Sequence, residues 1–288
     1  MIGNPSGSKY PRKKIKAITA IACGWVLCLL CCYCYEGVMN QTGRSNLIAA
    51  TAMWFVYAVT IVMLAVILCW ALYSQVNYGY RFWYQTLGIG SHIQVYGPQN
   101  RFNAGFEQLS AEKHVEAFEQ IRDAVHNGGM GLADIDYQPP GKEPRPLLHH
   151  AEVQHLQDVA DFIDRGRILF LVLLALWLPL ACLNIRLKSP PIRWRLGITV
   201  FTLGAMLAWL LIAGPTQVFY QFHLWIFPAD HQWFFYWQDS LMSTLMKAPV
   251  LFGGIAMVIA LGALLLTPVL YWFGLWGARI VLQHPADN

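Results

Sequence analysis

Two segments of the sequence carry histidines that could take part in acid–base chemistry. The first reads His149-His150-x4-His155-Leu156-Gln157-Asp158. In a helix, His155 and Asp158 lie three residues apart on one face, where the carboxylate can fix one imidazole tautomer and favour its protonated form. A histidine held in this way is suited to act as a general base. The alternative is a solvated helix face with an incidental ion pair, because pairs at this spacing are common.

The second segment surrounds His223 and is rich in aromatic residues. Ten aromatic side chains lie between Phe219 and Trp237. Tryptophan and tyrosine, which have a polar tip, concentrate where the hydrocarbon of a membrane meets water. A histidine at that depth lies near lipid ester bonds, so the segment indicates chemistry on lipids at a membrane surface. The alternative is an interfacial histidine whose ring reaches towards water without a catalytic role.

The remaining histidines do not form a recognisable metal site. Four of them are interpreted as surface or structural residues: His92, His114, His126 and His231. No pair at the i,i+4 spacing of zinc proteases occurs, and His149 and His150 cannot point the same way on a helix. We therefore predict no metal and no cofactor, with zinc held by two histidines and a carboxylate as the alternative.

The elements that must position these residues are membrane-spanning helices. The chain is 56% hydrophobic and only 12% charged, roughly half the charge that is usual for a soluble domain. Four uncharged runs are long enough to cross a hydrocarbon core of about 30 Å: Leu47–Tyr73, Ile168–Ile185, Leu196–Tyr220 and Ala248–Gly277. A weaker fifth candidate, Ile15–Tyr35, is interrupted by Lys16. The predicted fold class is an all-α integral membrane protein with these four transmembrane helices, a further N-terminal apolar helix, and a mainly helical extracytoplasmic loop domain.

The chain is predicted to divide into a membrane domain with a tail at each end. Residues 1–46 form a basic tail with a Cys-rich apolar segment, residues 47–277 form the membrane domain, and residues 278–288 form a second tail. Residues 77–167 are the large loop and hold 12 of the 16 acidic residues. Within it, Ser110 is expected to cap a helix that runs to about His126. An irregular connector, Gln138–Pro146, then leads to a helix that begins near Leu147 and continues into the span at Ile168.

The distribution of basic residues predicts the orientation in the membrane. Arg186, Lys188, Arg193 and Arg195 cluster in a short loop between two spans, and positive loops stay in the cytoplasm. The large loop and the segment around His223 would then both face outward. The basic N-terminus opposes this orientation if Ile15–Tyr35 crosses the membrane. The conflict is resolved if the segment lies at the interface without crossing, or if the basic loop is not cytoplasmic.

Composition also excludes several classes of function. The four predicted spans contain no Asp, Glu, Lys, Arg or His, which argues against proton or cation transport and against haem held between facing histidines inside the spans. The net charge of +4 comes without a basic stripe interleaved with aromatic residues, so no nucleic-acid partner is predicted. A non-enzymatic membrane scaffold or assembly protein remains an alternative to an enzyme.

Several short motifs, taken in their order along the chain, resemble the lipoprotein intramolecular transacylase family. They are His155-Leu156-x-Asp158-Val159, Phe222-His223-x3-Phe227, Trp233, Asp239-Ser240-Leu241, Pro249, and Tyr80–Tyr84 after the first predicted span. The resemblance covers about residues 47–277. It implies a bacterial inner-membrane protein with several spans and an extracytoplasmic active site, without a cofactor. It leaves the oligomeric state open.

The resemblance also implies a reaction and a set of site residues. An acyl chain would move from the sn-2 ester of a diacylglyceryl-modified lipoprotein to the α-amine of its N-terminal cysteine, within membrane lipid. His155 would be the general base and acid, oriented by Asp158, and His223 would polarise the ester carbonyl or share the proton. The residues expected to contact the substrate are Trp233, Asp239, Phe222, Phe227 and Tyr84. A lipid-ester hydrolase that uses the same residues is the alternative within this class.

Overall fold

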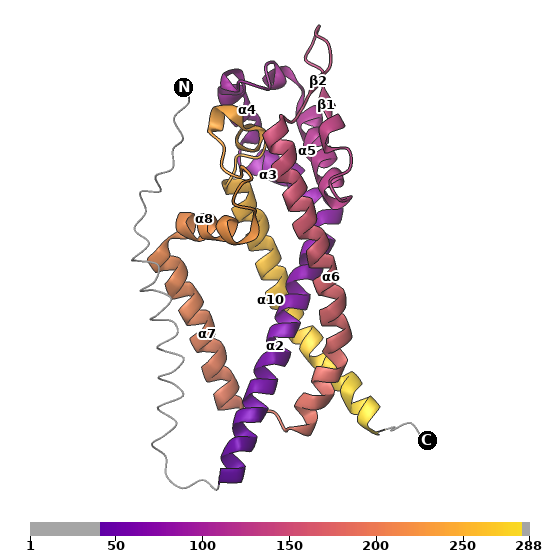
Figure 1. Cartoon of the computed structure of the whole chain (residues 1–288), viewed down its shortest axis with the longest axis vertical. Helices are drawn as coiled ribbons and strands as arrows, with labels where there is room; N and C mark the ends of the chain where they lie inside the picture. The colour runs from indigo at the N-terminus through magenta and orange to yellow at the C-terminus, as the bar shows by residue number, and fades with distance from the viewer. Residues whose placement is uncertain (1–40, 284–288) are drawn as a thin grey trace. The chain divides into compact units, whose positions relative to one another are not determined.

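The computed structural model describes residues 41–283, which are almost entirely helical (Figure 1). Four of these helices are long and apolar enough to cross a membrane: α2 (Gln41–Gln75), α6 (His150–Arg186), α7 (Ile192–Ala213) and α10 (Val250–Gln283). This confirms the predicted all-α membrane fold with four transmembrane helices. The N-terminal apolar candidate, Ile15–Tyr35, lies outside the described residues.

The third predicted span is divided into two helices. α7 ends at Ala213, and Gly214 has φ +80° and ψ 148°, a conformation that glycine adopts at little cost. α8 (Pro215–Ile226) follows directly, and a proline is well tolerated in the first turn of a helix because the N–H it lacks would have no partner there. The predicted span over Leu196–Tyr220 is therefore confirmed as a transmembrane helix up to Ala213, but its last residues belong to α8. His223 lies inside α8 and not just past the end of a transmembrane helix.

The chain forms two compact units. Among the described residues, the smaller unit comprises 41–52 and 189–221, and the larger unit comprises 53–188 and 222–283. In the smaller unit, no residue of α7 is buried, as expected for an apolar helix whose side chains face lipid. The larger unit contains a buried core and all the predicted site residues.

In the larger unit, three long helices pack through aromatic and small residues. α6 lies along α10 (Figure 1), and the hydroxyl of Tyr57 on α2 donates a hydrogen bond to the carbonyl oxygen of Tyr271 on α10 at 3.1 Å. A side chain at Gly274 would meet the hydroxyl of Tyr57 and the indole of Trp177. The absence of a side chain at Gly274 therefore allows the helices to approach closely, as is typical of helix packing in membranes.

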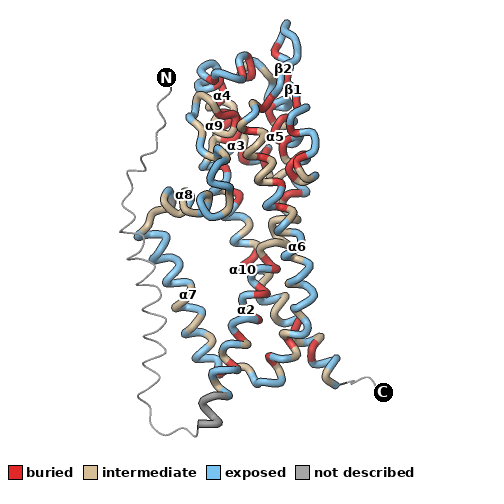
Figure 2. The backbone as a smooth tube through the Cα atoms, viewed as in Figure 1, coloured by how far each residue is buried: buried red, intermediate tan, exposed pale blue. Residues whose placement is uncertain are grey.

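A helical head outside the apolar part of these helices holds most of the buried core, which is coloured red in Figure 2. It contains α3 (Tyr80–Thr86), α4 (Ile89–Tyr96), α5 (Ala111–His126), the first turns of α6, and α9 (Leu241–Leu245). The ring of Tyr80 stacks on Phe118 with centroids 4.0 Å apart. The hydroxyl of Tyr80 donates to the carbonyl oxygen of Leu245 at 2.6 Å. These contacts tie α3 to both α5 and α9.

The two helices predicted in the large loop are confirmed. A short pair of β-strands in the same loop was not predicted. The hydroxyl oxygen of Ser110 accepts the N–H of Lys113 and caps α5, and α6 runs from His150 through Ile168 without a break. The connector Gln138–Pro146, predicted to be irregular, is instead the loop and second strand of a small β-hairpin. β1 (Asp136–Tyr137) pairs antiparallel with β2 (Arg145–Pro146), so part of this segment is ordered by backbone hydrogen bonds.

Candidate active site

His155 and His223 come together in the larger unit. His155 lies near the start of α6 and His223 in α8, and their ring centroids are 6.3 Å apart with the ring planes inclined by 26°. The two residues are 68 positions apart in the sequence, so only the folded chain joins them. The sequence predicted that both would serve one site, and the structure places the two rings side by side.

Aromatic side chains surround this histidine pair. The ring of Phe227 lies 5.0 Å from His155 and 5.2 Å from His223, measured between centroids. Trp233 lies 4.9 Å from His223, and Phe235 lies 6.0 Å from His155. Phe227 and Trp233, predicted to contact the substrate, therefore line the histidine pair. The surroundings of His155 are apolar on several sides and favour its uncharged form.

Phe222 lies at the edge of the same group. Its ring is 5.6 Å from His223 and 6.2 Å from Phe162 on α6. About 44% of the residue is exposed. It therefore combines contact with the pair and an open apolar surface that a lipid chain could reach.

His155 is held in its neutral form. α6 carries charged residues up to Arg167 and is uncharged only from Ile168, so His155 precedes the membrane-spanning part. Burial, and secondarily the nearby ring of His223, lower the pKa of His155 from 6.5 to about 4, and the charge of Asp158 opposes this only weakly. Among the described residues, the buried Nδ1 atom of His155 has no hydrogen-bond partner.

Asp158 binds a different histidine from the one predicted. Its two carboxylate oxygens lie 2.8 Å and 2.9 Å from Nδ1 of His231. The prediction that Asp158 orients His155 is not supported by this geometry, whereas the interpretation of His231 as a surface or structural residue fits its hydrogen bond to Asp158. A carboxylate gains little from a partner three residues away on the same helix, whereas the segment after α8 presents an imidazole nitrogen to it directly. The hydrogen bond to Asp158 raises the pKa of His231.

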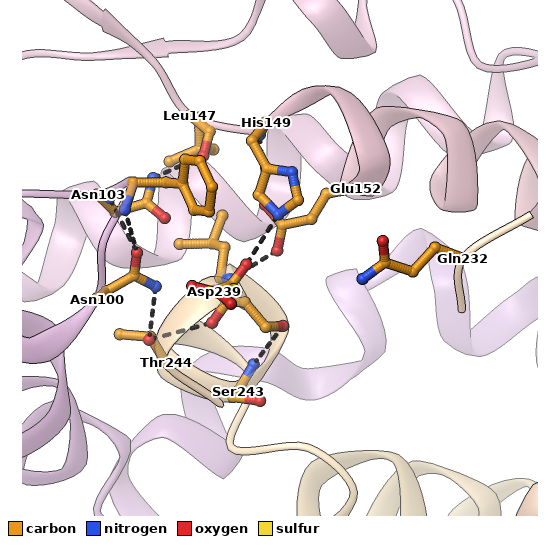
Figure 3. A network of polar contacts seen from close by, with 12 residues as sticks. Asn100, Asn103, Leu147, His149, Glu152, Gln232, Asp239, Ser243 and Thr244 are labelled. Atoms are coloured by element: carbon orange, nitrogen blue, oxygen red, sulfur yellow. Dashed lines mark hydrogen bonds and ion pairs between the residues drawn. The ribbon is translucent and has the colours of Figure 1, made fainter. Parts of the chain in front are cut away.

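A second polar network lies at the N-terminus of α6 (Figure 3). The side chain of Glu152 is fully buried. Its Oε1 atom accepts the N–H of Leu241 at 2.6 Å, and its Oε2 atom accepts the N–H of His149 at 3.4 Å. Nε2 of His149 donates to the carbonyl oxygen of Asp239 at 2.8 Å. The network therefore joins the start of α6 to the segment that leads into α9.

Asp239, predicted to contact the substrate, belongs to this network. Its carboxylate forms an ion pair with Arg101 at 3.2 Å, and the backbone N–H of Arg101 donates to the carbonyl oxygen of Gln238 at 2.8 Å. The structure gives Asp239 a clear role in holding its own segment. A contact with substrate stays a prediction.

Glu152 is a buried carboxyl group that the sequence analysis did not identify as a site residue. Burial raises its pKa to about 7 and outweighs the N–H groups of Leu241, His149 and Met242, which act in the opposite direction. A glutamate three residues after a helix N-cap is a recognisable capping signal. That signal could have located Glu152, but nothing in the local sequence indicates its bond to Leu241.

Tyr84 is partly buried and packs against the core of the head. Its hydroxyl forms a hydrogen bond of 2.9 Å with Nδ1 of His114, and Nε2 of the same histidine donates to the carbonyl oxygen of Phe106 at 3.0 Å. Burial lowers the pKa of His114, so a neutral ring with one donor and one acceptor satisfies both partners. The hydrogen-bond partner of Tyr84 is thus His114, which is not one of the two site histidines. The contact of Tyr84 with substrate stays a prediction.

Among residues 41–283, the side chains near the histidine pair do not form a metal centre. No group of three His, Cys, Asp or Glu side chains is arranged there to hold a metal ion. A structural zinc site uses four protein ligands and a catalytic site usually three. The two rings would therefore need a further ligand.

The fold and site define a multi-pass membrane protein with a histidine pair in an aromatic environment. Comparison with known proteins identifies the family. The family model "Lipoprotein intramolecular transacylase Lit" matches residues 53–248, and the chain belongs to this family of acyltransferases. No curated protein sequence matches the chain. Among solved structures, a single-residue variant of the membrane-integral lipoprotein intramolecular transacylase Lit from Bacillus cereus is similar, with 16% identity and a TM-score of 0.48. The match covers 83% of this chain and 99% of that one.

Proposed function

We propose that this protein moves the sn-2 acyl chain of a diacylglyceryl-modified lipoprotein to the α-amine of the lipoprotein's N-terminal cysteine. Family membership supports acyl transfer on lipoproteins as the general activity. The observation that carries the finer proposal is the pair of imidazoles 6.3 Å apart in an aromatic environment. Two rings this close together can both act on one ester carbonyl and the groups bonded to it.

The proposed reaction needs three proton transfers, two from the nitrogen and one to the leaving oxygen, and no further reactant. An α-ammonium group has a pKa near 8 and must lose a proton before its nitrogen can attack. The free amine then attacks the ester carbonyl carbon, its nitrogen gives up a second proton as the amide bond forms, and the bond from that carbon to the sn-2 oxygen breaks. The departing alkoxide takes up a proton, which leaves a free hydroxyl group. Because the amine and ester belong to one molecule, positioning supplies much of the rate.

The environments of the two histidines suggest how they share this work. A pKa of about 4 makes neutral His155 a weak base but makes its protonated form a strong acid. Once protonated, His155 is therefore well suited to return a proton to the alkoxide. His223, packed against Trp233, would polarise the carbonyl or assist in removing the first proton.

The proposed site faces the outer side of the cell membrane and draws its substrate from lipid. The basic loop Arg186–Arg195, held in the cytoplasm, supports this orientation. Trp225 and Tyr236 flank the site segments and are 68% and 70% exposed. Aromatic rings with polar tips suit the boundary between lipid tails and water. The proposed partners are diacylglyceryl-modified lipoproteins and membrane lipid, and the chemistry above requires no cofactor.

Replacing each histidine by alanine tests the proposal. His155→Ala and His223→Ala should each abolish formation of the N-acyl lyso-form, and the double variant should be little worse than either one because both groups serve one transition state. The measurement is mass spectrometry of lipoprotein N-termini from membranes that contain each variant. His150→Ala is a matched control, since this histidine is exposed on the first turn of α6.

Two outcomes would contradict the proposal. Full activity in His155→Ala would remove the acid–base assignment and favour a scaffold role. Release of free fatty acid without any N-acyl product would instead indicate a hydrolase that uses the same residues.

A further inference from the structure

We propose that Asp158 and His231 form a positioning clamp that holds the segment Phe227–Tyr236 over the histidine pair. The inference rests on the acyl-transfer function proposed above. It adds two residues that act through their neighbours, without a part in the proton transfers themselves. The clamp is defined here as the hydrogen-bonded pair Asp158–His231.

The segment that carries the aromatic wall has little regular structure of its own. Between the end of α8 at Ile226 and the turn that begins at Trp237, residues 227–236 form neither helix nor strand. One backbone hydrogen bond inside it joins the N–H of His231 to the carbonyl oxygen of Pro228 at 3.3 Å. A segment of this kind depends on side-chain contacts for a fixed position.

The clamp supplies such a contact at the centre of the segment. His231 meets both carboxylate oxygens of Asp158 within 2.9 Å. The side chain of Asp158 is 11% exposed and that of His231 is 28% exposed, so water screens this pair less than it screens a surface ion pair. Asp158 lies one turn beyond His155 on α6. The clamp therefore fixes the segment to α6, the helix that also carries His155.

Two residues that follow His231 in the sequence pack against the rings of His155 and His223. Trp233 lies two residues after His231 and packs on His223 at 4.9 Å. Phe235 lies four residues after it and faces His155 at 6.0 Å. The position of these two rings sets how the imidazoles are oriented and how much water reaches them. A shift of about 1 Å in such a site can cost on the order of 100-fold in rate.

The test compares kcat and KM of purified full-length variants with a synthetic diacylglyceryl lipopeptide in mixed micelles. His231→Phe keeps a ring but removes the nitrogen that meets Asp158, and Asp158→Ala removes the other half of the clamp. Each should lower kcat by roughly 10- to 100-fold with a smaller change in KM, because the clamp acts on the geometry of reaction. The double variant should be no worse than either single one. His231→Asn, which can still donate to Asp158, should recover most of the activity.

The controls separate the clamp from a general effect on folding. Asp164, further along α6, forms an exposed ion pair of 2.7 Å with Arg167, and Asp164→Ala should leave kcat within about twofold of the parent protein. Thermal unfolding and the amount of membrane-inserted protein are measured for every variant. If His231→Phe does not accumulate in folded form, Asp158→Ala removes the same hydrogen bond. Alanine is a good helix former, so this change should not disturb α6.

The results that would overturn the clamp differ from those that would overturn the function. Parent-like kcat in folded Asp158→Ala or His231→Phe, or single effects that multiply in the double variant, would refute the clamp alone. An active His155→Ala variant would refute the proposed acid–base function instead, whatever the clamp variants do.

Discussion

Glu152 should make the stability of this protein depend on pH in a way that one substitution can isolate. Its carboxyl group is buried with a pKa of about 7, against an ordinary value of 4.5. A carboxyl whose pKa is raised on folding favours the folded state in its protonated form. Its stabilising contribution is present below the unfolded pKa and is lost as the pH rises through the folded pKa.

The size of the effect follows from the two pKa values. The free-energy difference per unit of pKa is about 1.4 kcal/mol, so ionising Glu152 should cost the folded protein about 3 kcal/mol over the range from its ordinary pKa of 4.5 to about 7. His155 acts in the opposite direction. Its pKa falls from 6.5 to about 4 on folding, so its contribution grows as the pH rises through that range. The two effects largely cancel in the parent protein.

Glu152→Gln removes one titration and leaves the other in place. The amide can still accept the N–H of Leu241, and any fixed cost of the new NH2 group beside His149 is the same at every pH. The free energy of unfolding is measured in mild detergent with a rising fraction of SDS, from about pH 5 to pH 8. Relative to the glutamine variant, the parent protein should lose about 3 kcal/mol of stability across this range.

A flat difference between the two proteins over this range would refute the reasoning. It would mean that the N–H groups of Leu241 and His149 stabilise the carboxylate enough to offset its burial.

Two other predictions concern orientation and catalysis. Single cysteines at Ser91, Gln138 and Gln232, in a background without native cysteines, should react with an impermeant reagent in spheroplasts, and one at Ser189 should not; the reverse pattern would invert the orientation. The rate of acyl transfer should rise with pH towards the pKa of the substrate amine near 8 and should show no inflection near the ordinary histidine value of 6.5 from His155, whose pKa is about 4. A clear inflection near that ordinary value, lost in His223→Ala, would assign the base role to His223.

The sequence by itself determined the class of protein and most of the elements. Uncharged runs that are long enough to span a bilayer predict transmembrane helices because the bilayer forces every backbone polar group to bond within its own helix. Local signals also placed the cap at Ser110 and the helix that continues through Ile168, since helix caps and helical periodicity depend on residues only a few positions apart. The break at Gly214 was missed because the apolar run continues through it. Hydropathy measures composition and not backbone conformation.

The tertiary structure decided which polar side chains meet. The sequence indicated His155 and His223 as chemically suitable residues, but the choice of partner for Asp158 depended on a segment 73 residues away. In the same way, Glu152 could be read as a helix cap, whereas its bond to Leu241 and its raised pKa arise only when α6 and α9 pack together. Helical spacing reports which residues share a face. It does not report what the folded chain brings to that face, and burial by distant segments is what shifts a pKa.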